Sequence, residues 1–269
     1  MKKRISYILI TAAVILAASV IIFAVLHFTG GSTDTNAVYE DMRDSFESSG
    51  LLSANIGLIT KNVQDDTVTY GEFGSGVIFK KNDGMYYALT AAHVVSAEHS
   101  ELLVFTVNTD MRSENIHGLE GLNVLSADAY DSMYKAEIMF VSSLDDLAVI
   151  RFTTDEELSV MEFADNDPGI NDRIMCVGNP QNEWFRVSYG KVTSGIERFG
   201  EFKGFPSSAM KHTAYIQVGS SGGAAINEQM RLVGITPGAS LSLDKSTFNY
   251  GVMIPVSEIR KCLDEWTDR

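Results

Sequence analysis

The sequence predicts an all-β fold with one helix before it and one after it. From residue 53 onward, short runs rich in Val, Ile, Thr, Tyr and Phe are separated by Gly, Asn and Asp roughly every ten residues. Many short strands at such a spacing are typical of a β-sandwich or of β-barrels. The turn sequence at 81–84 lies between two of these runs and predicts a hairpin.

The helix before the β unit is predicted to be a membrane anchor. Three basic residues at positions 2–4 precede residues 5–28, which contain no Asp, Glu, Lys or Arg. A membrane-spanning helix needs about 20 apolar residues, whereas a cleaved signal peptide has an apolar region of roughly 7 to 15. Residues 1–29 are therefore expected to be a cytoplasmic tail and transmembrane helix, which leaves the rest of the chain outside the membrane. A long secretory signal is the alternative.

The remaining chain divides into a linker and one folded domain. Residues 30–36 are small and polar, as in flexible linkers, and we expect the domain to occupy 37–269. Apolar residues recur at helical spacing across 37–48, which predicts a short amphipathic helix at its start. The same spacing after the capping candidate Ser257 predicts a final helix at 257–267.

Charge excludes one class of partner. All 35 acidic residues lie after position 30, together with 18 of the 21 Lys and Arg residues, so this part carries a formal charge of −17. Nucleic acid binding depends on a basic surface, so nucleic acid is not expected as a partner.

The two cysteines, Cys176 and Cys262, have apolar neighbours in the sequence. An exported location would permit a disulfide between them. Buried thiols behave as small hydrophobic groups, so two unpaired core cysteines are favoured over a disulfide.

Three short segments carry groups suited to acyl transfer. His93 ends an apolar run, Asp146 opens another, and Ser221 stands in the glycine-rich sequence 219–223. Each has an ordinary structural explanation: a core histidine, a polar strand entry, or a loop. Together they supply a nucleophile, a base that takes its proton and a carboxylate that orients the base. Their order along the chain is that of chymotrypsin-type enzymes and differs from the orders in subtilisin and the α/β hydrolases.

Six segments extend this pattern, and they resemble the HtrA (DegP-like) branch of the trypsin-like serine proteases. The resemblance covers about residues 50–267 in order, and it is carried by GSGVIF (74–79), LTAAHV (89–94), DLAVI (146–150), VGNP (177–180), YGKVTSGI (189–196) and GSSGGAAIN (219–227).

The resemblance implies two six-stranded β-barrels with the active site in the cleft between them. We place the first barrel at about 50–155 and the second at about 160–255, so that His93 and Asp146 come from the first and Ser221 from the second. The resemblance also implies a serine endopeptidase that acts on exported proteins, in quality control or regulated proteolysis. It requires no cofactor or metal.

Residue roles follow from the matching motifs. Ser221 attacks the scissile carbonyl, His93 acts as general base and then general acid, and Asp146 orients the imidazole. Asp146 is preferred to Asp145 because it directly precedes Leu-Ala-Val, and Asp145 is expected to be a solvated neighbour. The backbone amides of Gly219 and Ser221 are expected to form the oxyanion hole.

The primary specificity pocket is expected to include Ile216 and the strand Gly234-Ile235-Thr236. A pocket that takes Lys or Arg side chains needs a carboxylate, and none occurs among these residues. We therefore expect a preference for small or medium apolar side chains.

The sequence also departs from the HtrA pattern. Ser220 precedes the nucleophile where HtrA relatives usually have Asn. Residues 109–132 form a predicted inserted surface loop whose single histidine, His117, is more typical of plain surface than of a metal site. The loop at 197–211 is the expected place of regulation. Because the chain ends after its final helix, whereas most HtrA proteins continue into a PDZ domain, we expect no PDZ-dependent substrate capture.

Two alternatives to a protease stay open. A catalytically silent trypsin-like fold would act as a chaperone or binding module, with Ser220 as its only support. A membrane-anchored receptor domain on an unrelated β-sandwich would require the motifs to be coincidental. HtrA relatives often form trimers through this region, so the helix at 37–48 either serves a homo-oligomer, such as a trimer, or packs on its own domain; packing is favoured.

Overall fold

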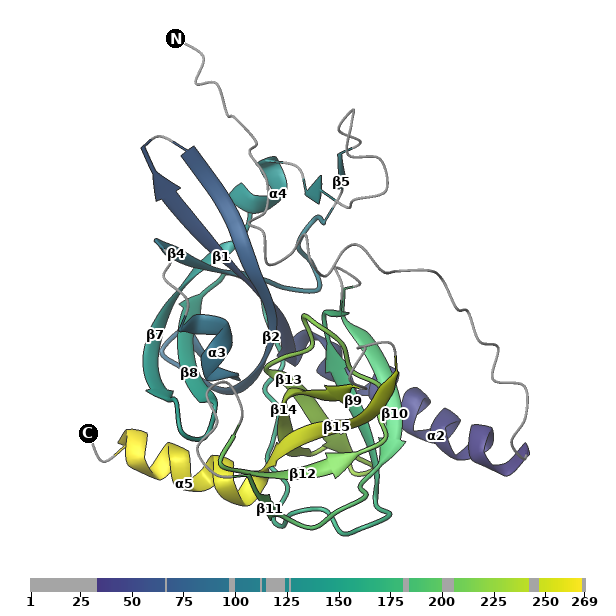
Figure 1. Cartoon of the computed structure of the whole chain (residues 1–269). Helices are drawn as coiled ribbons and strands as arrows, with labels where there is room; N and C mark the ends of the chain where they lie inside the picture. The colour runs from purple at the N-terminus through teal and green to yellow at the C-terminus, as the bar shows by residue number, and fades with distance from the viewer. Residues whose placement is uncertain are drawn as a thin grey trace.

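The computed structural model is a mostly β protein with two groups of strands and helices at its periphery (Figure 1). It describes residues 33–65, 67–96, 100–111, 113–114, 124–125, 127–180, 184–199, 206–241 and 247–267. The predicted membrane segment 5–28, most of the predicted insertion at 109–132 and His117 lie outside these ranges. Among the described residues, no helix is both long enough and apolar enough to cross a membrane.

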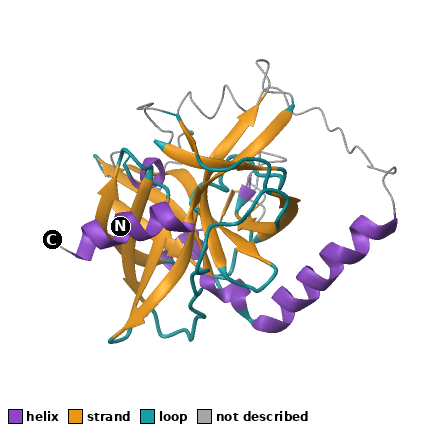
Figure 2. Cartoon of the chain, turned by 90° about the horizontal axis from the view of Figure 1, so that it is seen from below, coloured by secondary structure: helices purple, strands orange, loops and turns teal. Residues whose placement is uncertain are grey.

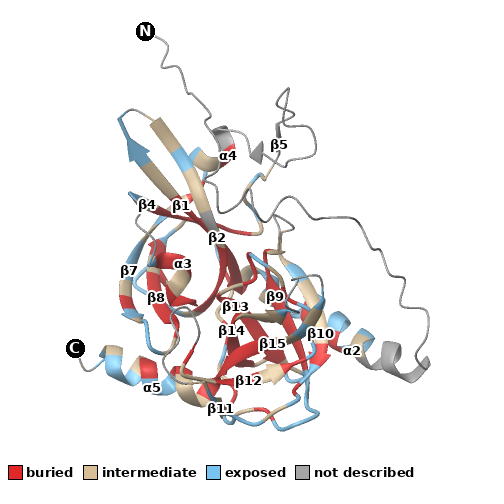
Figure 3. Ribbon diagram, viewed as in Figure 1, coloured by how far each residue is buried: buried red, intermediate tan, exposed pale blue. Residues whose placement is uncertain are grey.

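The first group of strands forms a closed six-stranded barrel, as predicted, in the order β1-β2-β3-β8-β7-β4. All its strand pairs are antiparallel. Its strands are β1 (Asn55–Gln64), β2 (Thr67–Asn82), β3 (Met85–Thr90), β4 (Glu101–Phe105), β7 (Tyr134–Ser142) and β8 (Leu147–Thr153). β1 and β2 extend beyond the barrel as a hairpin, in which the last two residues of β1 are exposed (Figure 3).

The second group is a seven-stranded antiparallel sheet in the order β10-β9-β13-β14-β15-β12-β11. Its strands are β9 (Arg173–Gly178), β10 (Arg186–Lys191), β11 (Glu197–Arg198), β12 (Ser208–His212), β13 (Gly223–Asn227), β14 (Leu232–Leu241) and β15 (Phe248–Pro255). Thr193 N donates to Lys211 O over 2.8 Å and Thr213 N donates to Lys191 O over 3.0 Å, which joins the end of β10 to β12. The second group therefore differs from the six-stranded barrel predicted for it: it is a seven-stranded sheet that includes the short strand β11, and hydrogen bonds link its edge strand β10 to β12.

The 3₁₀ helix η1 (Leu51–Ala54) joins the N-terminal helix to β1. Other short elements connect strands: the one-turn helix α3 (Ala92–Val95), the helix α4 (Ala127–Asp131) and the two-stranded ribbon of β5 (Ser113–Glu114) and β6 (Val124–Leu125).

The N-terminal helix α2 (Thr33–Ser49) packs on the second sheet by one apolar stripe. Met42 and Phe46 are each 3% exposed within the largest core cluster, and the ring of Tyr39 lies 5.5 Å from that of Tyr189. The predicted helix is confirmed, and its apolar face is used within the chain. It begins at Thr33, so residues 33–36, assigned to the linker, are helical, and this end projects away from the sheets (Figure 2).

The C-terminal helix α5 (Val256–Thr267) confirms the second helix prediction. Ile259 and Cys262 are buried, and the Trp266 ring contacts the rings of Phe79 and Tyr87 at 6.3 and 5.8 Å. The capping prediction was wrong: Ser257 lies inside the helix, and its amide donates to the Asp167 carboxylate over 2.8 Å. An acid at a helix N-terminus also interacts favourably with the helix dipole.

Both cysteines are buried and no disulfide joins them, as favoured from the sequence. Cys176 lies in the core of the second sheet, where burial raises the pKa of its thiol to about 12. A thiol with such a pKa is protonated at neutral pH and is a poor nucleophile.

His212 is a buried histidine at the end of β12. It is 0% exposed, and a Cβ atom added to Gly251 would lie 2.1 Å from its Cε1 atom, so the ring covers that glycine closely. Burial lowers the pKa of His212 to about 4, which outweighs the raising effect of the nearby Val252 and Ala214 backbone.

We expect acid to destabilise the domain through His212. Between about pH 6.5 and 4 the unfolded chain binds a proton that the folded domain excludes, so the free energy of unfolding falls as pH falls, by about 3 kcal/mol in total. Urea unfolding at pH 7.5, 6 and 4.5 would measure this loss, with His212→Leu as the comparison. An equal loss in both proteins would contradict the assignment.

Candidate active site

The carboxylate of Asp146 binds both the imidazole and the backbone amide of His93 at one end of the first barrel. His93 lies on α3, directly after β3, and its Nδ1 atom is 2.8 Å from Asp146 Oδ2 and 3.0 Å from Oδ1. The amide of His93 donates to Asp146 Oδ1 over 2.9 Å. The Asp146 side chain is 2% exposed and the His93 side chain 35%, so a buried carboxylate orients an imidazole that is open to solvent.

Asp146 holds this position with a left-handed backbone. It ends the turn between β7 and β8, and its φ is 51°. Such a conformation costs a non-glycine residue roughly 1–2 kcal/mol, although Asp tolerates it better than most. The Asp146 carbonyl accepts from the amide of Ala92 over 3.1 Å, which links the turn to α3.

Ser221 lies in a tight loop that only glycines allow. Ser220 N donates to Gln217 O over 2.9 Å, and Gly219 has a φ of 94°, as required at the third position of a type II turn. Gly222 has a φ of 87°, and a Cβ atom there would lie 2.1 Å from Ser75 O. A larger residue at either position would therefore rebuild the loop that carries Ser221.

The backbone of this loop leaves two amides available for an anion. Within the described residues, the amides of Gly219 and Ser221 donate no hydrogen bond. Their carbonyls point to the first barrel instead: Gly219 O accepts from Ser75 Oγ over 2.7 Å, and Ser221 O accepts from Ser75 N over 2.8 Å. Two nearby N–H groups without partners can bind a developing oxyanion.

Ser75 is therefore central to the site, and the sequence interpretation gave it no role. Its hydroxyl also accepts from Asn179 N over 2.9 Å and lies 3.2 Å from Asn179 Nδ2, while its carbonyl accepts from Thr90 Oγ1 over 2.7 Å. Ser75 is 1% exposed and Asn179 2%. The available signal was a serine between two glycines at 74–76 and the VGNP segment at 177–180.

The two serines of the loop have different partners. The Ser221 hydroxyl donates to the carbonyl of Pro237 over 3.0 Å. Ser220 is 5% exposed, and its Oγ accepts from Gln217 N over 3.3 Å, which closes the turn before the nucleophile position. Ser220, the departure from the HtrA pattern, thus stabilises the loop locally.

The side chains assigned to the specificity pocket face the interior. Ile216 is 4% exposed and Ile235 is fully buried, each in an apolar core cluster. Thr236 Oγ1 lies 3.0 Å from Ser220 O, and Gly234 pairs with Ala225 in the sheet. These residues can therefore offer a ligand their backbone rather than their side chains.

Two side chains near this loop that were not assigned to the pocket are exposed. Val218 is 78% exposed and Tyr215 is 52% exposed, and neither was assigned to the site from the sequence. The Tyr215 ring packs edge-on against Phe248, with 5.1 Å between ring centroids.

Comparison with known proteins identifies the family. The trypsin-like peptidase domain matches residues 74–235, a range that contains His93, Asp146 and Ser221. The chain belongs to the trypsin-like peptidase family. The six-stranded barrel and the second sheet agree with the all-β fold class expected from the sequence.

Several curated proteins are similar to this chain at low sequence identity. Proteins described as "Serine protease HtrA-like" from Staphylococcus aureus strains MRSA252 and USA300 are each 28% identical to the peptidase over 215 residues. The match covers 74% of this chain and 24% of each relative. The chain thus spans about a quarter of the length of these relatives.

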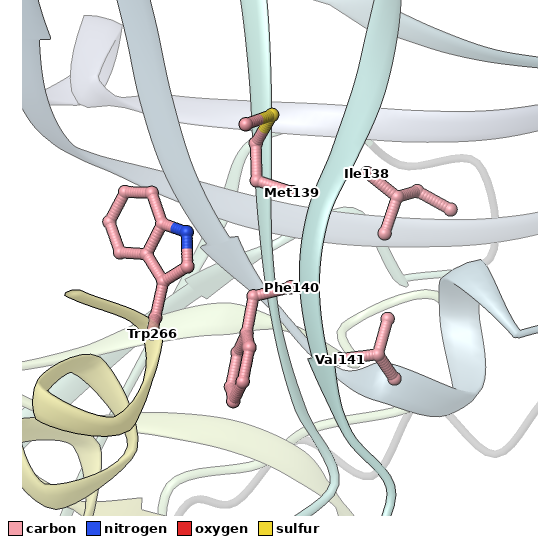
Figure 4. A pocket seen from close by; sticks show the side chains of 5 residues that line it. All are labelled: Ile138, Met139, Phe140, Val141 and Trp266. Atoms are coloured by element: carbon pink, nitrogen blue, oxygen red, sulfur yellow. The ribbon is translucent and has the colours of Figure 1, made fainter. Parts of the chain in front are cut away.

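Two surface hollows contain none of the residues assigned to the site. One is lined by Ile138, Met139, Phe140, Val141 and Trp266, where β7 meets α5 (Figure 4). The other lies between the β7–β8 turn, β11 and α5. In the described part of the peptidase, no three His, Cys, Asp or Glu side chains are grouped to hold a metal ion.

Proposed function

We propose that the peptidase domain is a serine endopeptidase in which Ser221, His93 and Asp146 act as a catalytic triad. The observation that supports this most strongly is the orientation of the His93 imidazole by a buried carboxylate at 2.8 Å. Because Nδ1–H donates to Asp146, the Nε2 atom is left unprotonated and can act as a base.

Catalysis begins with a rotation of the Ser221 side chain. Its hydroxyl leaves the Pro237 carbonyl, gives its proton to His93 Nε2 and attacks the scissile carbonyl carbon. The amides of Gly219 and Ser221 bind the oxyanion, an interaction worth a few kcal/mol for each donor. His93 then protonates the leaving amine. In the second half of the reaction, water attacks the acyl-enzyme while His93 takes its proton, and His93 then returns this proton to Ser221.

Substrate choice and place of action are part of the same proposal. Residues 5–28 hold the peptidase in a bilayer with its N-terminus in the cytoplasm, so its substrates are exported polypeptides in quality control or regulated proteolysis. The side chain before the cleaved bond is small or medium and apolar in this proposal, because residues 216 and 234–236, which can offer a ligand their backbone, include no carboxylate.

A second candidate function is polypeptide binding without hydrolysis, by a catalytically silent trypsin-like fold. The Ser221 hydroxyl bond to Pro237 O favours it, since a hydroxyl that donates its one proton there does not donate it to His93. Hydrogen bonds within active sites are often formed only with substrate bound, so this geometry is also compatible with an active enzyme.

Reaction with a fluorophosphonate distinguishes the two functions, since the reagent requires an activated serine. We expect the purified domain to be labelled and Ser221→Ala to remain unlabelled. Labelling of neither protein, with both folded, would favour the silent fold.

A further inference from the structure

Asp145, the residue before Asp146, connects the turn to the second sheet. Its Oδ2 atom accepts from Ser142 Oγ over 2.7 Å within the turn. Its Oδ1 atom accepts from Ser207 Oγ over 3.0 Å, a contact between residues 62 positions apart. The expectation of a solvated neighbour was therefore wrong.

A second contact runs beside the first. Ser207 N donates to the carbonyl of Leu144 over 2.9 Å, so Ser207 binds two consecutive residues just before Asp146. Ser207 immediately precedes β12, the strand whose continuation leads to the Ser221 loop. The turn under His93 and the approach to Ser221 are thus joined outside the site itself.

These contacts hold the turn in which Asp146 has a left-handed backbone. A strained conformation persists only where the surrounding structure over-determines it. Asp146 has a φ of 51°, and three of the four positions before it, 142, 144 and 145, take part in the hydrogen bonds just described. Without Ser207 and Asp145, the turn can relax, which moves the carboxylate away from His93 Nδ1.

We infer that Asp145 is a positioning residue, which works through Ser207 to hold Asp146 in line with His93. The inference rests on the proposed function, and it adds a role for a carboxylate that touches neither His93 nor substrate. Interactions of this kind act on rate, since misplacement of a reacting group by about 1 Å can cost on the order of a hundredfold.

The test variants are Asp145→Ala, Ser207→Ala and the double variant that combines these two changes. The control variants are Ser207→Thr and Ser208→Ala. Ser207→Thr keeps the hydroxyl, and Ser208 is the neighbouring serine. The measured quantity is the rate constant for fluorophosphonate labelling of folded protein. We expect each single variant to lose about tenfold, the double variant to lose no more than the worse single, and Ser207→Thr and Ser208→Ala to stay within about threefold of the parent.

A second measurement works even if the protein does not hydrolyse or label. The proton between His93 Nδ1 and Asp146 can be followed by proton NMR and assigned by its loss in Asp146→Asn. We expect faster solvent exchange of this proton in Ser207→Ala and parent-like exchange in Ser208→Ala. Unchanged exchange and labelling, with only a lower melting temperature, would overturn the inference; absent labelling with altered exchange would overturn the proposed function alone.

Discussion

Replacement of Asp146 by asparagine is expected to lower kcat/KM by about four orders of magnitude in a folded protein. Asp146 Oδ1 accepts from the His93 amide, and Oδ2 lies 2.8 Å from Nδ1. Asparagine keeps the first bond through its single oxygen and places its NH₂ group against Nδ1. The ring then carries its proton on Nε2, where it cannot take the proton of Ser221.

Asp172→Asn is a suitable control, because Asp172 also caps a turn through its carboxylate, by accepting from Gly169 N over 2.7 Å. The melting temperatures of both variants are expected to lie within a few degrees of that of the parent. A decrease of less than tenfold in kcat/KM for Asp146→Asn, measured on a cleaved peptide, would contradict the role of the carboxylate.

Replacement of Ser75 by alanine is expected to lower kcat by about a hundred- to a thousandfold, with a much smaller change in KM. Its hydroxyl donates to the carbonyl of Gly219 over 2.7 Å, in the peptide group that joins Gly219 to Ser220. Without this bond the peptide group can shift and displace the adjoining amides of Gly219 and Ser221, and the loss of one oxyanion donor has a cost of that magnitude. The buried amide of Asn179 also loses its acceptor, which costs roughly 1–3 kcal/mol of stability.

Thr60→Val separates these two effects. Thr60 is 1% exposed in the same barrel, and its Oγ1 donates to the Gly71 carbonyl over 2.6 Å. We expect this variant to lose stability without losing kcat. If Ser75→Ala behaved in the same way, Ser75 would support the fold and not the oxyanion loop.

The sequence predicts what depends on local pattern. Strand content and the helices α2 and α5 follow from periodicity, whereas the proximity of His93 to Asp146, 53 positions apart, was expected only from the resemblance to a known family. Contacts between distant residues carry no such signal: Ser75 and Gly219 are 144 positions apart, and the Asp167 cap is 90 positions from Ser257. Neither pairing is visible until the chain is folded.

The pocket residues, which stay a prediction, show a second limit. Side chains in extended segments alternate between the two sides, so neighbouring positions face opposite ways and a sequence does not say which position faces a ligand. Ile216 is buried while its neighbour Tyr215 is half exposed. Asp145 and Asp146 likewise face different partners: Asp145 binds Ser207 and Asp146 binds His93, and Asp146 has a left-handed backbone.

Peptide mapping of the fluorophosphonate adduct identifies the nucleophile directly. We expect mass spectrometry to find the label on Ser221 and not on Ser220. We expect no reaction of Ser221→Ala, and slow reaction of Asp146→Asn and, less slow, of Ser75→Ala. A label on another serine, or equal reaction of Ser221→Ala, would contradict the assignment of Ser221 as the nucleophile.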